Sequence, residues 1–195
     1  MSDLFDQPED ATPLEPEELE GLRPSWISTR SELNQAEQDN IAAGVAWVSR
    51  SRRKDLLTEE FIRKLHTKIF GDVWAWAGDF RKTERNIGID PIRIPVELRT
   101  LLDDVKYWTD HTTYPPDETA VRFHHRLVAI HPFPNGNGRT ARLLADLLVE
   151  ELGGKPFTWG RASLTDAGEA RLRYIDALRA ADRHDIGPLL AFARS

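Results

Sequence analysis

The sequence predicts an all-α fold with one inserted β-hairpin, and three observations lead to this prediction. Residues that cap helix N-termini repeatedly precede apolar residues spaced three and four apart. Glycine or proline marks the boundaries of most of these segments. Only residues 83–94 instead carry β-branched residues on both sides of a turn. With 195 residues, 40% of them hydrophobic, the chain is long enough for one domain with a core.

The first 24 residues are predicted to form a flexible acidic arm. Eight acidic residues precede the first basic residue, Arg23, and prolines interrupt the stretch. Such a segment has too little apolar surface to offset the entropy lost on ordering. We expect at most a short helical turn over residues 16–20, and a solvated run of charge rather than a docking segment.

The first two long helices are predicted from their starting residues. Thr29 and Glu32 have the spacing of a capping box, and the helix continues to about residue 53. Thr58 starts the second helix, an apolar face follows at three- and four-residue spacing, and Gly71 ends it.

Five further helices are predicted in the rest of the chain. Proline is suited to the first turn of a helix, and it starts three of them. Two consecutive glycines end the helix that starts near Asn137, and Ser163 or Thr165 caps the next one. The predicted ranges are about 95–110, 116–130, 137–152, 163–182 and 188 to the C-terminus.

Residues 83–94 are predicted to form the hairpin. They contain the strand-like runs Asn86-Ile87-Gly88-Ile89 and Ile92-Arg93-Ile94, with Asp90-Pro91 at the turn. β-Branched residues around such a turn are typical of two antiparallel strands.

Composition excludes several classes of function. The absence of cysteine excludes disulfides, thiolate metal sites and a cysteine nucleophile. A net charge of −6 argues against a nucleic-acid partner, which requires an excess of lysine and arginine. The N-terminus is acidic where a secretory signal is basic and then apolar, and no apolar run is long enough to span a membrane. We therefore expect a cytoplasmic protein without membrane or nucleic-acid partners.

One segment, residues 131–142, carries the features of a binding site for phosphate. It reads His131-Pro-Phe-Pro-Asn-Gly-Asn-Gly-Arg-Thr-Ala-Arg142, and its prolines and glycines predict a loop between two helices. Unpaired amide groups at the start of the second helix, together with the helix dipole, favour an anion. Arg139 and Arg142 lie on one face of that helix and add fork-shaped donors suited to polyphosphate.

His131 is the candidate general base at this loop. An imidazole has an ordinary pKa near 6.5, so it can accept a proton at neutral pH. The residues by themselves thus predict a nucleotide or phosphorylated ligand at a helix start, with a base beside it. The alternative for an isolated histidine is a structural role, in which it ends a helix and bonds to a carbonyl.

The same segment resembles the signature of the Fic (Fic/Doc, Fido) family, His-Pro-Phe-x-(Asp/Glu)-Gly-Asn-Gly-Arg-x-x-Arg. The matching positions are His131, Pro132, Phe133, Gly136, Asn137, Gly138, Arg139 and Arg142. The similarity extends upstream through residues 65–71 and through Trp74-Ala75-Trp76-Ala77-Gly78-Asp79-Phe80-Arg81, so it covers most of residues 25–195. The segment Thr29-Arg30-Ser31-Glu32-Leu33-Asn34 is similar to the branch called mobile mystery protein B.

The resemblance implies a Fic-type helical bundle that transfers AMP from ATP to a Tyr, Ser or Thr hydroxyl of a target protein. It implies that His131 accepts the hydroxyl proton and that Mg²⁺ assists the triphosphate. Relatives of the Doc type, which transfer phosphate, carry lysine at the position of Gly138, and this difference favours AMP transfer. The implied phosphate-binding residues are Gly136, Asn137, Gly138, Arg139 and Arg142. The hairpin resembles the family's flap, which docks the target through residues corresponding to Ile87, Gly88, Ile89 and Ile92.

The sequence departs from the family pattern at two positions. Asn135 stands where the family has the acidic ligand of Mg²⁺, which predicts weakened metal binding. Ser28 and Glu32 fit the family's inhibitory pattern (Ser/Thr)-x-x-x-Glu-(Gly/Asn), in which the glutamate pairs with the second motif arginine, here Arg142, but Leu33 stands where the pattern has glycine or asparagine. Glu32 is equally the capping partner of Thr29, and both interpretations stay open.

Three functions therefore compete. The first is a protein adenylyltransferase, autoinhibited or toxin-like and restrained by an antitoxin-like protein. The second is a catalytically weak module that binds a nucleotide and regulates a partner. The third is a hydrolase that removes AMP from a modified target, with Glu32 positioning the water.

Overall fold

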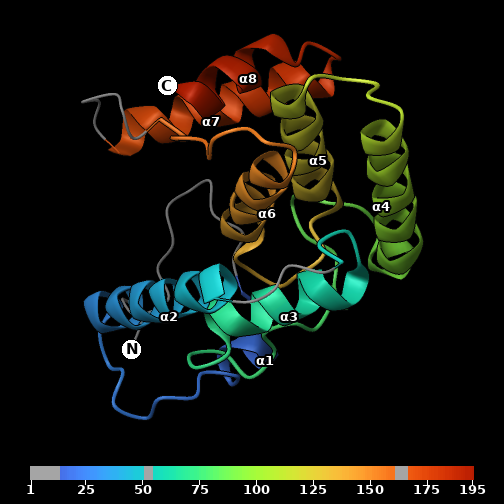
Figure 1. The fold of residues 1–195 in the computed structure, drawn as a ribbon. Helices are drawn as coiled ribbons and strands as arrows, with labels where there is room; N and C mark the ends of the chain where they lie inside the picture. The colour runs from blue at the N-terminus through green and yellow to red at the C-terminus, as the bar shows by residue number, and fades with distance from the viewer. Residues whose placement is uncertain (1–13, 51–54, 161–166) are drawn as a thin grey trace.

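The computed structural model describes residues 14–50, 55–160 and 167–195 (Figure 1). Within these ranges the structure is helical, and none of the helices has both the length and the apolar character needed to cross a bilayer. In chain order the elements are α1 (Pro16–Leu19), α2 (Arg30–Arg50), α3 (Glu59–Phe70), the 3-10 helix η1 (Pro91–Arg93), α4 (Ile94–Asp110), α5 (Pro116–Ile130), α6 (Asn137–Glu151), α7 (Ala167–Asp182) and α8 (Gly187–Arg194).

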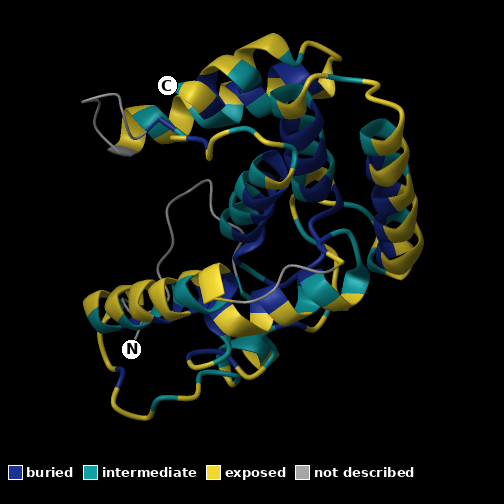
Figure 2. Ribbon diagram, in the orientation of Figure 1, coloured by how far each residue is buried: buried dark blue, intermediate teal, exposed yellow. Residues whose placement is uncertain are grey.

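Helices α5 and α6 form the central pair of the bundle, and the remaining helices pack around it. Helix α4 packs on α5, α2 lies along α3, and α7 pairs with α8 across the top of the view in Figure 1. The buried faces of α3, α5 and α6 point toward one another (Figure 2). The largest fully buried side chains include Phe70, Trp74, Phe123 and Phe133. Phe133 belongs to the α5–α6 loop, so this loop is built into the core.

The helix boundaries predicted from local sequence are largely confirmed. The hydroxyl of Thr58 accepts a hydrogen bond from the amide of Phe61 at 3.1 Å, which starts α3 as expected. Helix α5 begins at Pro116 and α6 at Asn137, also as expected. The predicted end of the first long helix at residue 53 and the predicted start of α7 lie outside the described residues.

The predicted hairpin at 83–94 is wrong, because the described residues contain no β-strand there or elsewhere. Residues 83–90 form a loop, and η1 and α4 follow directly. The carboxylate of Asp90 accepts the amide of Ile92 at 3.0 Å and starts η1 where the second strand was expected. The guanidinium of Arg81 takes the carbonyls of Thr83 and Ile89, so these groups do not pair across a ladder.

Residues 14–24 lie against the domain, which differs from the expectation of a flexible arm for this part. The amide of Arg23 donates to the carbonyl of Val73 at 2.8 Å, and the amide of Ala75 donates to the carbonyl of Gly21 at 2.8 Å. The short helical turn expected over residues 16–20 is present as α1. Residues 1–13, which make up the rest of the predicted arm, lie outside the described residues.

Candidate functional site

Two left-handed residues shape the loop between α5 and α6. His131 ends α5 with φ 54°, and Gly136 precedes α6 with φ 77°. A positive φ is uncommon for a residue with a side chain, so His131 is held by its surroundings. A Cβ added at Gly136 would stand 2.4 Å from Cε2 of Phe70, so only glycine fits. The two reversals bring the end of α5 beside the start of α6.

Asn137 fastens this loop internally. Its carbonyl oxygen accepts the amide of Phe133 at 2.9 Å, and its Nδ2 donates to the Phe133 carbonyl at 2.8 Å. The residue is buried. The resemblance implied that this side chain orients phosphate oxygens, whereas here both of its polar atoms bond to the loop backbone.

His66 on α3 holds the loop from the opposite side. Its Nδ1 accepts the amide of Gly78 at 2.9 Å, so Nε2 carries the proton and donates to the carbonyl of Asn135 at 3.0 Å. The ring stacks on Phe133 at 3.8 Å. Burial lowers the pKa of His66 to about 3, which keeps the ring neutral. The sequence showed only a histidine on the apolar face of α3 and contained no signal for this contact.

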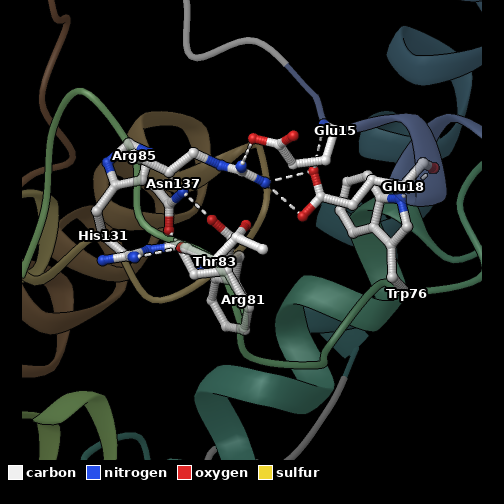
Figure 3. A network of polar contacts seen from close by, with 9 residues as sticks. Glu15, Glu18, Trp76, Arg81, Thr83, Arg85, His131 and Asn137 are labelled. Carbon is white, nitrogen blue, oxygen red and sulfur yellow. Dashed lines mark hydrogen bonds and ion pairs between the residues drawn. The ribbon is translucent and has the colours of Figure 1, made fainter. Parts of the chain in front are cut away.

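Arg81 fixes the backbone at the candidate base (Figure 3). Its Nε donates to the carbonyl of His131 at 2.6 Å, and its Nη2 donates to the carbonyl of Ile130 at 3.4 Å. These carbonyls lie at the C-terminal end of α5, where a cation is favoured. Burial and the positive charge of Arg81 lower the pKa of His131 to about 4. The imidazole is therefore neutral at pH 7 and able to accept a proton.

The loop that replaces the predicted hairpin covers His131. A Cβ added at Gly88 would stand 2.7 Å from Cβ of His131, and the amide of Ile89 donates to the carbonyl of Ile130 at 3.4 Å. His131 is consequently 6% exposed. Of the residues predicted to dock a target, Ile87, Gly88 and Ile92 are exposed, and Ile89 is half-buried.

Arg139 is paired with a carboxylate from α2. Its Nη1 lies 2.7 Å from Oε2 of Glu37, and its guanidinium carbon lies 4.6 Å from the ring centre of Phe70. The other oxygen of Glu37 accepts Nε1–H of Trp74 at 2.8 Å. The indole thus orients the carboxylate toward Arg139. Nothing in the local sequence points to Glu37, because its partner lies more than a hundred residues further along the chain.

Glu32 forms the predicted capping interaction at the start of α2. Its Oε2 accepts the amides of Ser28 and Thr29 at 2.8 and 2.9 Å, and the hydroxyl of Thr29 accepts the amide of Glu32 at 3.3 Å. These bonds lower the pKa of Glu32, with the backbone amide of Ser28 contributing most. This geometry favours the capping interpretation, and the carboxylate of α2 that contacts a motif arginine is Glu37.

Arg142 lies against a side chain outside the sequence motif. Its guanidinium carbon lies 5.3 Å from the ring centre of Tyr174 on α7. The Tyr174 hydroxyl lies 3.0 Å from Nε2 of the buried His124. A Cβ added at Gly138 would stand 3.8 Å from both the Tyr174 hydroxyl and Nη1 of Arg142. These groups therefore surround the first turn of α6.

Asn135 does not fit the role of a metal ligand. Its Oδ1 accepts the amide of Gly136 at 2.5 Å and lies 3.4 Å from Nη2 of Arg139. An oxygen that faces an amide and a guanidinium is poorly placed to face a cation as well. The described residues contain no group of three or more His, Cys, Asp or Glu able to hold a metal ion.

The fold and the loop thus define a helical domain with an anion-binding geometry at the start of α6 and a neutral imidazole beside it. Residues 56–149 match the family model described as the Fic/DOC family. Protein adenylyltransferase Fic of Aedes aegypti is 30% identical over 144 residues, which are 72% of this chain and 28% of that protein. Protein adenylyltransferase fic-1 of Caenorhabditis elegans is 30% identical over 146 residues, covering 73% of this chain and 27% of that protein.

Solved structures show the same fold. A fragment of Fic-1 from Caenorhabditis elegans aligns with TM-score 0.65 and 26% identity, over 90% of this chain and 50% of that chain. The BepC protein of Bartonella tribocorum, crystallised with bound AMPPNP, aligns with TM-score 0.70 and 15% identity, over 92% of this chain and 97% of that one. This chain therefore contains a Fic/DOC family domain. It spans about 28% of the length of the Aedes adenylyltransferase.

Proposed function

We propose that this chain is a protein adenylyltransferase that moves AMP from ATP to the hydroxyl of a Tyr, Ser or Thr in a target protein. The observation that carries the proposal is the neutral imidazole of His131 in the loop before α6, whose first turn contains Gly138 and whose second turn carries Arg142. Relatives with about 30% identity are named protein adenylyltransferases, which supports the same reaction here.

The first turn of α6 is suited to bind the triphosphate. The first amide groups of a helix lack partners within the helix, and the helix dipole adds positive potential. Gly138 has no side chain to exclude a phosphate from this turn, and Arg142 points to the same place. Fixed donors of this kind stabilise the negative charge that develops on phosphate oxygens during transfer.

His131 is the proposed general base. Its neutral ring would accept the hydroxyl proton while the hydroxyl oxygen bonds to the α-phosphorus and the bond to pyrophosphate breaks. Arg81 keeps the backbone of His131 in position through its carbonyl. Because the loop of residues 83–89 covers the ring, a target has to displace this loop before its hydroxyl reaches Nε2 or Nδ1.

No step in this mechanism runs through Mg²⁺. The side chain of Asn135 faces donors, so this position offers no metal ligand of the usual kind. Any metal that accompanies ATP would be held by its phosphates and by water.

A restrained or regulatory state is the second candidate, and the Glu37–Arg139 pair favours it. A carboxylate on Arg139 competes with any phosphate for the same donors. A module that binds a nucleotide weakly without transfer is consistent with this pair and with Asn135. The removal of AMP with Glu32 as the water-positioning group has no support, because Glu32 is engaged in the cap.

Several finer predictions rest on the sequence alone. They are membership of the mobile mystery protein B branch, a toxin-like role with an antitoxin-like partner, and a cytoplasmic location. The proposed chemistry is compatible with each of them and depends on none.

The proposed reaction is tested with labelled ATP. Incubation of the chain and a cell extract with α-³²P-ATP should label protein, whereas γ-³²P-ATP should not. His131→Ala should abolish the labelling. His125→Ala, on the outer part of α5, is the matched control and should retain it. ATP binding without any His131-dependent label would instead support the regulatory module.

A further inference from the structure

Arg85 is a buried cation in the loop that covers His131. Its side chain is 1% exposed, and its partners come from the N-terminal helix α1 (Figure 3). Nη1 lies 2.7 Å from Oε1 of Glu15, and Nη2 contacts both carboxylate oxygens of Glu18. A buried cation requires such partners, because an unpaired charge inside a protein is costly.

The two carboxylates leave the Nε–H of Arg85 unused. Its Nε is buried and has no hydrogen-bond partner in the described part of the chain. A guanidinium prefers a carboxylate that takes two parallel N–H bonds. The contacts with Glu15 and Glu18 use only the two terminal nitrogens. A carboxylate that also accepts the Nε–H would give the guanidinium an additional hydrogen bond.

Helix α1 is a short element at the surface of the domain. It has four residues, none of them buried. Besides the ion pairs, its backbone is held by Nε1–H of Trp76, which donates to the carbonyl of Glu18 at 3.0 Å, and by the bridge between Leu22 and Trp74. Leu14 and Leu22 on either side of α1 pack against the core, so a competing peptide needs these apolar residues as well as the carboxylates.

The position of Arg85 connects this anion site to the candidate base. In the chain, Arg85 stands between Arg81 and Gly88. Arg81 bonds to the carbonyl of His131, and Gly88 packs on the His131 side chain. A ligand bound at Arg85 is therefore attached to the loop that a target has to displace. The positive charge of Arg85 also acts on the imidazole, because it contributes to the lowered pKa of His131.

We propose that Arg85 recognises an acidic segment of the target protein with two carboxylates three residues apart, and that Glu15 and Glu18 occupy this site in cis. The proposal rests on the proposed function, because it names a feature of the target of that reaction. The exchange of one carboxylate pair for another keeps Arg85 neutralised throughout. A neutral or basic segment could not replace α1 in the same way.

A binding experiment tests the site without catalysis. The probe is a fluorescein-labelled peptide with the sequence of residues 14–22, titrated into the full chain. The double variant Glu15→Gln/Glu18→Gln should bind it about tenfold more tightly than the wild type does, because its own competitor is weakened. Glu17→Gln/Glu20→Gln carries the same change of charge on the exposed side of α1 and should bind like the wild type. Equal binding by the two double variants would overturn the proposal.

Three further measurements make the result specific. A peptide with glutamine at the positions of Glu15 and Glu18 should not bind, and binding of the acidic peptide should be lost when Arg85→Gln is added to the first double variant. Should that protein fail to fold, Arg85→Lys removes the fork while keeping the charge and should weaken binding. Displacement of the peptide by inorganic tripolyphosphate would overturn the proposal, because Arg85 would then belong to the nucleotide site.

The failure of the proposed function is distinguished from the failure of this inference by the transfer assay. If no variant transfers label from α-³²P-ATP while the peptide still binds at Arg85, the adenylyltransferase proposal fails and the acidic-segment site stands. If His131-dependent transfer occurs but tyrosine peptides with and without an acidic pair are modified equally, the inference fails.

Discussion

Glu37 on α2 and Arg139 on α6 form an ion pair of 2.7 Å that joins the N-terminal half of the domain to the first turn of α6. Trp74 orients the carboxylate, and Asn135 contacts the same guanidinium. A nucleotide that uses Arg139 has to compete with this carboxylate.

Glu37→Gln should therefore raise the affinity for ATP about tenfold, since a neutral amide competes with phosphate less well than a carboxylate does. Equilibrium dialysis with labelled ATP measures the affinity. Glu32→Gln is the matched control on the same helix and should leave ATP affinity unchanged, because Glu32 caps α2. The reverse result would restore the inhibitory interpretation of Glu32.

Tyr174→Phe should weaken ATP binding while leaving ADP binding unchanged, if Arg142 holds the γ-phosphate. The substitution keeps the ring and removes the hydroxyl that Arg142 contacts. Arg142→Ala should have the same selectivity and a larger effect, and the double variant should be no worse than Arg142→Ala alone. Tyr107→Phe, at an exposed position on α4, is the control. Equal losses for ATP and ADP would indicate a merely structural role of Tyr174.

Asn135→Asp should lower the Mg²⁺ concentration needed for half-maximal transfer about tenfold. A carboxylate has a second oxygen, which can face the phosphates and their metal while the first still accepts the amide of Gly136. Initial rates over a range of Mg²⁺ concentrations check this expectation. An unchanged midpoint would show that the side chain at this position does not govern the use of metal.

Gly136→Ala should destabilise the domain by about 1–3 kcal/mol, because it adds both left-handed strain and a collision with Phe70. Gly153→Ala has a similar positive φ of 82° with no atom within 4 Å of the added Cβ, so it reports strain alone. Urea unfolding of the two variants separates the contributions. Equal losses would mean that Phe70 moves aside without cost.

The free energy of unfolding should fall as the pH drops below about 6.5, the ordinary pKa of histidine. Burial lowers the pKa of His66 and His124 to about 3 and that of His131 to about 4. Between these values and 6.5 the unfolded chain binds protons that the folded chain does not, so stability is present above 6.5 and is lost toward pH 3–4.

In this pH range each buried histidine adds up to about 1.4 kcal/mol per pH unit to the slope of the free energy of unfolding against pH. Urea unfolding at pH 7, 6 and 5 measures it, and His124→Gln should reduce the slope by about one histidine's share. A free energy of unfolding that is flat from pH 7 to 5 would contradict the neutral, buried state of all three rings.

Most helices and the position of the loop between α5 and α6 follow from local sequence. Thr58, Pro116 and the glycines after residue 152 act on backbone groups within a few residues, so their effects can be read locally. The loop within residues 131–142 can also be predicted locally, because its prolines end a helix and its glycines allow the backbone to turn. A prediction that depends on neighbours within one helical turn needs no knowledge of the fold.

Only the tertiary structure decided what the loop contacts. Residues 83–94 have strand-like composition, yet Arg81 takes the carbonyls that a ladder would need, and it is placed there by the end of α5. Glu37 rather than Glu32 meets a motif arginine because α2 lies along α3, which packs on α6. The packing of the helices decides which charged and hydrogen-bonding residues far apart in the chain come into contact. Helical periodicity predicts the buried face of each helix but not the residue that this face will contact.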